Sequence, residues 1–432
     1  MLEISVAGYK SIGSSTSVRV RGLTILSGKN SSGKSSFMQP ILLIKQTLES
    51  NFDTGSILLN GPNVKLTDSS QAFSSSSGAS SKVFTLKIQS ISNTTVNNTG
   101  INLEFTKDKN LGLICSRVEA RNPITNTPIS INKDSTDSDI RNQLPKFSSE
   151  VIKNSFENLE IESWSVRQNK CLLDLNITIK SPSISIPLNI TDLVEKTASQ
   201  IIHVPGIRGN PERSYRISTS ANRFTGSFDP YVASIIHTWK NSSNNEAKTK
   251  ATELIADMKS LGLGSEIRAN KVNDTQIEIE ISRFIGSKSN DVVNIADVGF
   301  GVTQTLPVLT SLIAADANQI VYIEQPELHL HPKAQFQLAS ILAKAVSRGV
   351  KVIIETHSAI LIRGIQLSVA KKRLNHNSID LYWFTQDTAG NSKTVASEMD
   401  ALGRTGDWPS DFDEVSLEVN RSYLNAVESA QE

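Results

Sequence analysis

The sequence predicts an α/β protein in which a mixed sheet with flanking helices is split along the chain and interrupted by a β-rich and helical insertion. Three observations support this fold class. A glycine-rich loop lies between a strand-like run and a helix-like run close to the N-terminus. From about residue 60 to residue 192, alternating apolar and polar residues are separated by turns rich in Ser, Thr and Asn, which is typical of antiparallel strands. Near residues 320 and 350, two apolar runs flank a helix-like run, which is typical of buried parallel strands.

Taken in order, the elements divide the chain into four expected parts. Residues 1–60 form an N-terminal lobe, 61–200 the β-rich insertion, 201–290 a helical and strand region that joins the lobes, and 291–432 a C-terminal lobe. Apolar periodicity predicts strands at Leu2–Val6, Ser17–Val20, Leu23–Leu26, Val83–Ile88, Glu266–Lys271, Gln276–Ser282, Gln319–Glu324 and Val350–Glu355. It predicts helices from the loop to Leu48 and at Tyr231–Trp239, Ala251–Leu261 and Ala334–Val346. No heptad pattern persists between the loop and the C-terminal lobe, which excludes a long coiled-coil arm.

The glycine-rich loop matches the phosphate-binding pattern G-x-x-x-x-G-K-[ST]. Its nine residues are Gly28, Lys29, Asn30, Ser31, Ser32, Gly33, Lys34, Ser35 and Ser36. Glycines let successive backbone N–H groups converge on phosphates, the lysine reaches the outer phosphates, and the serine hydroxyl ligates Mg²⁺. The loop therefore predicts binding of a nucleoside triphosphate, with Lys34 on the phosphates and Ser35 on Mg²⁺; the alternative is an ordinary turn of small residues.

Composition narrows the class of protein. Of the 432 residues, 38% are apolar, which is enough for a large core, and the formal net charge is +1. A near-neutral chain is not one whose whole surface binds nucleic acid, although a local basic groove is compatible with it. No apolar run is long enough to span a bilayer, and the residues Met1–Ser5 do not resemble a signal peptide. We therefore expect a cytoplasmic protein with no membrane partner.

Five segments in a fixed order carry a resemblance to a known superfamily. They are Tyr9–Ile12, the glycine-rich loop, Asp297–Gln304, Tyr322–Pro332 and Glu355–Ser358. Together they resemble ATPases of the ABC/SMC superfamily, and within it the overcoming-lysogenisation-like and RecF-like ATPases of bacteria. The string EQPELHLHP at 324–332 is highly specific to this group. Segments 204–213 and 406–412 are similar to a subgroup of uncharacterised bacterial ATPases, whereas roughly residues 60–200 carry no resemblance. The implied fold is an ABC-type P-loop ATPase head, with ATP and Mg²⁺ as cofactors.

The resemblance implies roles for two residues that follow buried strands. Glu324 takes the Walker B position, which orders Mg²⁺, and His357 takes the switch position, which contacts the γ-phosphate. Both positions agree with the physics of open α/β sheets, whose ligands bind at the carboxyl ends of the strands. Lys10 is expected either to reach the nucleotide or to lie solvated at a strand end. Gln46 is expected on an exposed face of the first helix.

The segment Asp297–Gln304 resembles the signature motif, which in this superfamily contacts the γ-phosphate held by the opposite subunit. Gly299 and Gly301 let the backbone approach phosphate, and Thr303 offers a hydroxyl ahead of a helix expected to begin near Leu306. The resemblance therefore implies a homodimer with ATP sandwiched between two heads, and it leaves a higher oligomer open. The alternative is a glycine-rich helix N-terminus that makes an ordinary turn.

Gln325 departs from the usual pattern, because ABC ATPases carry at this place the carboxylate that orients the attacking water. Three interpretations remain open. Glu327 serves as the base in its place, Gln325 positions water in a slow enzyme, or the protein is an ATP-binding switch with little hydrolysis. The nearby pair His329 and His331 has a spacing that a metal could use, but no third ligand is apparent.

The resemblance implies two alternative functions. In the first, the ATPase is a sensor and scaffold that controls a separate effector, a nuclease or toxin, in bacterial antiphage defence of the Septu or PARIS kind. A separate effector is expected because related enzymes append a TOPRIM nuclease, and the 75 residues after His357 are too few for one. In the second, the protein is a RecF-like ATPase that binds DNA in repair, so nucleic acid stays open as a partner. The candidate DNA-binding residues are the arginines Arg208, Arg213, Arg216 and Arg223. A transporter ATPase is a third class, which the β-rich insertion disfavours.

Overall fold

The structure, a computed structural model, describes residues 1–53, 55–76, 79–91, 99–121, 128–143, 161–181, 183–218, 223–282, 291–406 and 421–423. The chain forms two compact units. Unit 1 comprises Met1–Val20, Ser35–Ile201 and Gln386–Lys393, and unit 2 comprises Arg21–Lys34, Ile202–Thr385 and Thr394–Glu432. The four-part division expected from the sequence stays a prediction. Of the tail segment 406–412, only Gly406 lies within the described residues.

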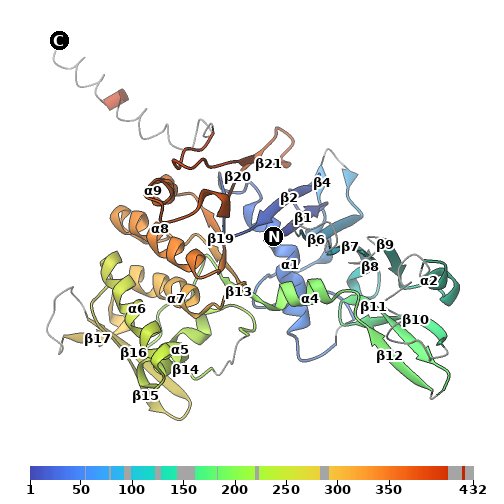
Figure 1. Ribbon diagram of the computed structural model, residues 1–432, viewed down its shortest axis with the longest axis horizontal. Helices are drawn as coiled ribbons and strands as arrows, with labels where there is room; N and C mark the ends of the chain where they lie inside the picture. The colour runs from blue at the N-terminus through green and yellow to red at the C-terminus, as the bar shows by residue number, and fades with distance from the viewer. Residues whose placement is uncertain are drawn as a thin grey trace. The chain divides into compact units, whose positions relative to one another are not determined.

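Unit 1 is built mainly on a six-stranded antiparallel sheet with the order β2-β1-β6-β7-β8-β9 (Figure 1). Its strands are β1 (Leu2–Ala7), β2 (Thr16–Val20), β6 (Val83–Ser90), β7 (Thr99–Asp108), β8 (Gly112–Arg121) and β9 (Pro128–Asn132). Phe84, Leu86 and Ile88 are buried at alternate positions of β6, because successive strand side chains point to opposite faces. Phe84 stacks on Phe105 of β7 with ring centroids 4.8 Å apart. The alternating pattern at 83–88 thus correctly predicted a strand with one buried face.

Smaller elements complete unit 1. They are the hairpin β4 (Ser75–Ser76) and β5 (Ala79–Ser80), the sheet of β10 (Ile161–Asn169), β11 (Leu172–Ile179) and β12 (Ile184–Leu188), the helices α2 (Asp137–Gln143) and α4 (Asp192–Ser199), and the 3-10 turn η1 (Ser69–Ala72). Helix α1 (Lys34–Leu48) follows the glycine-rich loop and belongs to unit 1 from Ser35 onward.

The expectation for Gln46 is wrong. Its side chain is 2% exposed, and its amide oxygen accepts hydrogen bonds from the N–H groups of Asn63 (3.2 Å) and Val64 (2.9 Å). Its amide nitrogen donates to the carbonyls of Leu58 (2.6 Å) and Val64 (3.1 Å). The second half of α1 is buried all round, so a polar residue there satisfies loop backbone instead of facing water.

Unit 2 is built on a sheet with the order β13-β18-β19-β3-β20-β21. These strands are β13 (Ile201–Val204), β18 (Ile320–Glu324), β19 (Lys351–Thr356), β3 (Leu23–Gly28), β20 (Ile379–Gln386) and β21 (Ser392–Ser397). Strand β3 pairs in parallel with β19 on one side and β20 on the other, and β19 pairs in parallel with β18. The carboxyl ends of β18, β19 and β3 therefore meet at one edge of the sheet, which positions the site described below.

A second sheet in unit 2 has the order β14-β16-β15, with β17 paired to β16. Its strands are β14 (Tyr215–Arg216), β15 (Ile267–Asn273), β16 (Gln276–Ser282) and β17 (Val292–Asn294). The helices of unit 2 are α5 (Val232–Asn241), α6 (Asn245–Leu261), α7 (Phe300–Ala314), α8 (Pro332–Ser347) and α9 (Ala359–Ala370). Three 3-10 turns, η3 (Asp229–Tyr231), η4 (Ile295–Asp297) and η5 (His376–Ser378), connect them. The structure confirms the strands expected near 266–271 and 276–282 to within a few residues. It also confirms the four expected helices, although α6 begins six residues before its expected start.

Helix α7 begins at Phe300 and not near Leu306 as the sequence analysis expected, and Pro307 lies inside it. A proline is favoured in the first turn of a helix, which made 306–307 look like a start. Burial explains why the helix tolerates Pro307 at an interior position, because residues Thr303–Ile313 are all buried in the core of unit 2.

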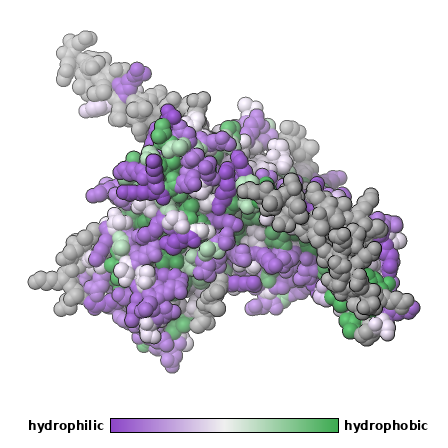
Figure 2. Space-filling model, in the orientation of Figure 1, coloured by the Kyte–Doolittle hydropathy of each residue, from purple (hydrophilic) through white to green (hydrophobic). Residues whose placement is uncertain are grey.

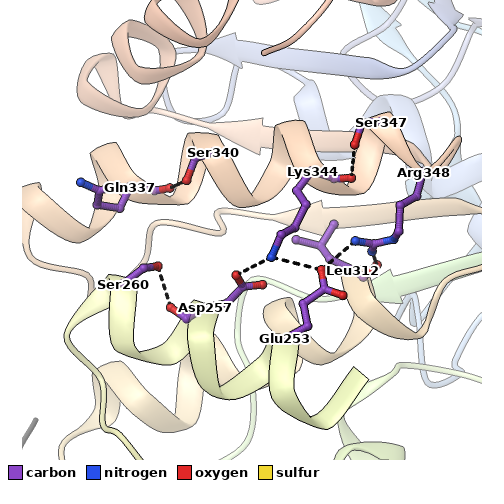
Figure 3. Close-up of polar contacts among 9 residues, drawn as sticks. All are labelled: Glu253, Asp257, Ser260, Leu312, Gln337, Ser340, Lys344, Ser347 and Arg348. Atoms are coloured by element: carbon purple, nitrogen blue, oxygen red, sulfur yellow. Dashed lines mark hydrogen bonds and ion pairs between the residues drawn. The ribbon is translucent and has the colours of Figure 1, made fainter. Parts of the chain in front are cut away.

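Helices α6, α7 and α8 lie side by side in unit 2 and are joined by polar contacts (Figures 1 and 3). Lys344 on α8 bonds to Asp257 (3.0 Å) and Glu253 (3.3 Å) on α6. Arg348, just after α8, bonds to Glu253 (2.8 Å) and donates to the carbonyl of Leu312 on α7 (2.7 Å). We call Glu253, Asp257, Lys344 and Arg348 the helix cluster.

Among the coloured residues on the face drawn in Figure 2, hydrophilic side chains predominate. Within the described ranges, no helix is long and apolar enough to cross a membrane.

Candidate functional site

The glycine-rich loop follows β3, which lies between β19 and β20 in the sheet. All six residues of β3 are buried. Three loop residues have positive φ: Gly28 (143°), Ser31 (63°) and Gly33 (101°). A Cβ at Gly28 would lie 2.0 Å from the carbonyl oxygen of Phe384, so only glycine fits there. The loop is thus turned sharply between strand and helix, as backbone that presents N–H groups to phosphate must be.

The Lys34 side chain is 5% exposed and lies under the loop. Its ammonium donates to the carbonyls of Gly28 (3.0 Å) and Lys29 (2.6 Å) and to the Ser32 hydroxyl (3.4 Å). Burial lowers its pKa, and the negative charges of Glu355 and Glu327 oppose that shift. Lys34 is therefore a buried cation that lies near two carboxylates but makes its hydrogen bonds to neutral oxygens.

Glu327 lies at the carboxyl end of β19, although it comes three residues after β18. Its Oε1 accepts from the Thr356 hydroxyl (2.7 Å) and from the His357 N–H (3.0 Å), while its Oε2 is buried and has no hydrogen-bond partner among the described residues. Burial raises the pKa of Glu327, and these hydrogen bonds only partly oppose it. A carboxylate with an elevated pKa and an unused oxygen is the state expected of a general base.

His357 follows β19 and lies half-buried beside the loop. Burial lowers the pKa of its imidazole, the charge of Lys34 lowers it further, and a hydrogen bond to the Gly28 backbone opposes both. The structure thus brings Lys34, Glu327 and His357 together at the edge where β3 and β19 end, through contacts that the strand order makes possible.

Glu324 ends β18 and is fixed by residues that the sequence analysis did not assign to the site. His203 of β13 lies 3.0 Å from its Oε1 through Nε2, and the Gly206 N–H donates to its Oε2 (3.1 Å). Burial acts to raise the pKa of Glu324, but His203, Gly206 and Arg208 together outweigh it and lower the pKa. The carboxylate is therefore held ionised. Gly206 and Arg208 lie in the segment 204–213 that is similar to other ATPases, but nothing in the sequence placed this segment beside Glu324.

Arg208 ties β18 to α7 by backbone contacts. Its guanidinium donates to the carbonyls of Gln304 (2.8 Å) and Glu324 (2.8 Å), and the Gln304 amide returns a hydrogen bond to the Arg208 carbonyl (3.1 Å). Arg208 is 4% exposed, and Arg213 pairs with Asp297 at 2.8 Å. Burial removes Arg208 from the basic stripe considered for DNA, whereas the Arg213 side chain is 73% exposed in a surface ion pair.

Gln325 lies half-buried with φ 45°, and its N–H donates to the Glu355 carbonyl (2.9 Å). Such a φ is costly for a residue with a side chain and marks a tightly constrained turn after β18. His329 also has positive φ (65°) and is exposed. Across the described part of the chain, no group of three His, Cys, Asp or Glu side chains is arranged to hold a metal ion. Within that part, His329 and His331 therefore have no third residue with which to form a metal site.

The signature-like segment forms the start of α7. Gly299 caps the helix and is exposed, and apart from its chain neighbours no atom of the described residues lies within 4 Å of where a Cβ would be. Phe300 is 52% exposed, and Gly301 lies against the His329 carbonyl, 3.1 Å from its own Cβ position. Thr303 lies within the helix and not ahead of it, and its hydroxyl donates to the Phe300 carbonyl (3.0 Å). This helix start is an exposed, glycine-rich surface.

The other candidate residues belong to unit 1 or to the loop itself. Lys10 follows β1 with φ 47°, and its ammonium donates to the Gln39 side chain of α1 (2.6 Å). Ser35 and Ser36 follow Lys34 in the first turn of α1, and Asn30 lies at the exposed tip of the loop. The roles of all these residues toward a nucleotide stay predictions.

Comparison with known proteins agrees with this geometry. A family model described as "AAA ATPase domain" matches residues 1–362. No curated protein sequence matches the chain. Three solved structures are similar in arrangement. A complex described as "SmcHead bound to the C-winged helix domain of ScpA" is 13% identical with a TM-score of 0.45, and the match covers 92% of this chain and 97% of that one.

The other two structures are of the same kind. The SMC head domain from Thermotoga maritima is 10% identical with a TM-score of 0.41, and covers 92% of this chain and 98% of its own. The third is an Smc head with an extended coiled coil, bound to the C-terminal domain of ScpA derived from Pyrococcus furiosus. It is 12% identical with a TM-score of 0.45, and the match covers 99% of this chain and 100% of that one. Because these identities and TM-scores are low, the family match carries the assignment.

Proposed function

We propose, from the premise that this chain belongs to the AAA ATPase domain family and is an ATP-binding ATPase, that a second copy of the chain completes its nucleotide site. The observation that carries this proposal is the start of α7. Its glycine-rich turn is exposed at Gly299 and Phe300, and within the described ranges only the chain neighbours of Gly299 lie near its Cβ position. A backbone surface of this kind at a helix N-terminus suits the phosphates of a nucleotide held by a partner.

The residues around the glycine-rich loop have distinct proposed roles. Loop N–H groups and Lys34 hold the phosphates, and His357 donates a hydrogen bond to the γ-phosphate. Glu327, whose pKa burial raises, accepts the proton of the attacking water. Of the three interpretations of Gln325, we therefore favour the one in which Glu327 replaces the missing carboxylate.

Oxygen ligands for Mg²⁺ fit the positions that the motifs give. The Ser35 hydroxyl and the ionised Glu324 carboxylate are hard oxygen donors, and Mg²⁺ prefers such ligands. Bound Mg²⁺ would neutralise phosphate charge. His203 and Gly206 then serve as positioning groups that keep Glu324 in one orientation.

Steady-state ATP hydrolysis, measured across protein concentration with Mg²⁺, tests the two-copy site. The specific rate should rise with concentration as copies associate, and should be lost in Lys34→Ala. A specific rate that is constant from nanomolar to micromolar protein would show that one copy is sufficient.

We further propose that the ATP cycle controls a separate effector, a nuclease or toxin, in bacterial antiphage defence. Sequence resemblance alone supports this step, through the string EQPELHLHP at 324–332. Capture of a neighbouring-gene product with ATP but not with ADP would support it, and equal capture with both would contradict it.

A further inference from the structure

The Lys34 ammonium lies in the field of two carboxylates without bonding to either of them. Burial lowers its pKa, and Glu355 is the charge that opposes this shift most, followed by Glu327. Within the described ranges, the hydrogen bonds of the ammonium go to two loop carbonyls and a loop hydroxyl. Opposite charges attract strongly where water is excluded, so other groups must hold the two carboxylates away from the lysine.

Each of the two carboxylates accepts a hydrogen bond from a hydroxyl group of the sheet. Glu327 Oε1 accepts from the Thr356 hydroxyl (2.7 Å), and Glu355 Oε1 accepts from the Tyr322 hydroxyl. A carboxylate can only accept, so the hydroxyl is the donor in both bonds, and bonds of this kind are stronger than those between neutral groups. The two hydroxyl groups therefore compete with Lys34 for the carboxylate oxygens.

Tyr322 is fixed in the position that its bond to Glu355 requires. It is fully buried on β18. Glu324 is opposite Glu355 in the parallel pairing of β18 with β19, and Tyr322 lies two residues before Glu324, so Tyr322 and Glu355 share one face of the sheet. The Tyr322 ring stacks on the His203 ring, with centroids 5.2 Å apart and planes 12° apart. Strand β19 also pairs with β3, which leads into the glycine-rich loop, so Glu355 is held beside the nucleotide site.

We propose that Tyr322 is a positioning residue for ATP hydrolysis: its hydroxyl holds the Glu355 carboxylate and so keeps the Lys34 ammonium available to phosphate. Without this hydroxyl, Glu355 pairs with Lys34, and ATP has to displace that pair in order to bind. The competition acts before ATP is bound and not on the bound complex, so it raises KM and leaves kcat nearly unchanged. The inference rests on the proposed function, in which Lys34 holds the phosphates.

Calorimetry with the full chain, Mg²⁺ and the slowly hydrolysed analogue ATPγS tests this inference. Tyr322→Phe keeps the ring and its stack, and it should weaken binding about 10-fold, as expected if about one molecule in ten keeps an unpaired ammonium. Glu355→Gln alone should bind at least as tightly as the wild type, because an amide carries no charge that attracts the lysine. The double variant Tyr322→Phe/Glu355→Gln should recover the wild-type affinity, because the carboxylate that captures Lys34 is absent.

Steady-state hydrolysis supplies a second measurement. Tyr322→Phe should raise the KM for ATP about 10-fold and change kcat by less than about 2-fold. Tyr231→Phe is the matched control, because it removes another tyrosine hydroxyl of unit 2, one that donates to the Thr225 carbonyl (3.1 Å). This control should leave both KM and kcat unchanged.

The same measurements separate this inference from the proposed function. If Lys34→Ala binds ATPγS as tightly as the wild type, the proposed role of Lys34 is wrong and the inference is wrong with it. If Lys34→Ala weakens binding and Tyr322→Phe does not, only the inference is overturned. A double variant as weak as Tyr322→Phe would also overturn it, because a general distortion, or a loss transmitted through Glu324, is not reversed by removing the Glu355 charge. Weaker binding by Glu355→Gln alone would overturn it even if Tyr322→Phe does not fold.

Discussion

Two groups of acidic and basic side chains in unit 2 differ in how their charges are paired. They are the helix cluster and the residues around the glycine-rich loop, which we call the site cluster. In the helix cluster, Lys344 and Arg348 bond directly to Glu253 and Asp257. In the site cluster, which comprises Lys34, Glu324, Glu327 and His357, the Lys34 ammonium donates to carbonyls and a hydroxyl while its neighbouring carboxylates bond elsewhere.

An unpartnered oxygen does not by itself distinguish the clusters, because both Asp257 Oδ2 and Glu327 Oε2 are buried without a hydrogen-bond partner in the part of the chain that the structure describes. The two clusters differ in the groups to which their cations bond. Charges that neutralise one another hold helices together, whereas the Lys34 ammonium lies near carboxylates without bonding to them and is available to a third, charged molecule. We therefore expect substitutions in the site cluster to change activity and those in the helix cluster to change stability.

The largest effect is expected from Lys34→Ala. Removing the ammonium should lower ATP hydrolysis about 100-fold or more, because electrostatic stabilisation of transferring phosphate is lost. The substitution also removes the three hydrogen bonds of the ammonium within the loop, so hydrolysis is compared at a temperature where the variant is folded. Phosphate release measures hydrolysis, and thermal unfolding shows where the variant is folded. Lys344→Ala is the matched control, and an equal loss of hydrolysis in it would contradict the distinction between the clusters.

Glu327→Gln should also lower the rate about 100-fold, because an amide cannot accept the proton of water. ATP binding, measured by calorimetry, should be retained. Gln325→Ala distinguishes Glu327 from Gln325 as the residue that acts on the attacking water. If Glu327 is the base, this substitution should lower the rate of hydrolysis by less than about 10-fold. If Gln325→Ala removes activity and Glu327→Gln does not, Gln325 is the residue that positions water.

A moderate effect on stability is expected in the helix cluster. Arg348→Ala removes the bonds to Glu253 and to the Leu312 carbonyl and should lower the free energy of unfolding by about 1 kcal/mol. Hydrolysis at a temperature where the variant is folded should equal that of the wild type. Urea denaturation measures the loss; an unchanged midpoint would show that these contacts contribute nothing.

The smallest effect concerns pH. Burial raises the pKa of Glu327 in the folded state, so the folded protein holds this proton more tightly than the unfolded chain. Stability from this group is therefore present below its unfolded pKa of about 4.3 and is lost as pH rises through the raised value. Glu327→Gln has no such loss, so its melting temperature should exceed that of the wild type by about 1–2 °C at pH 8 and by less at pH 5. A difference that shrinks as pH rises would contradict this assignment.

The sequence predicted the parts of the site that depend on local pattern. The glycine-rich loop with the helix after it, the strand that ends in Glu324 with the helix at 334–346, and the strand near 350–355 are set by short-range periodicity and turn residues. Helix α9 (Ala359–Ala370) was not predicted. The contacts of Glu324 with His203 and of Arg208 with Gln304 were not predictable, because they join segments about 100 residues apart through the strand order. The start of α7 was misplaced because burial in the core outweighs the local cost of Pro307.

The most direct test of the two-copy site is complementation between two inactive variants. Lys34→Ala removes phosphate binding from one chain, and Gly299→Trp blocks the exposed helix start of the other at a position with space for a side chain. Each variant alone should be inactive. Mixed in equal amounts, half of the dimers pair the two variants and contain one complete site, so about one quarter of the wild-type rate of ATP hydrolysis should return. No recovery in the mixture, with both variants folded and associated, would contradict the account.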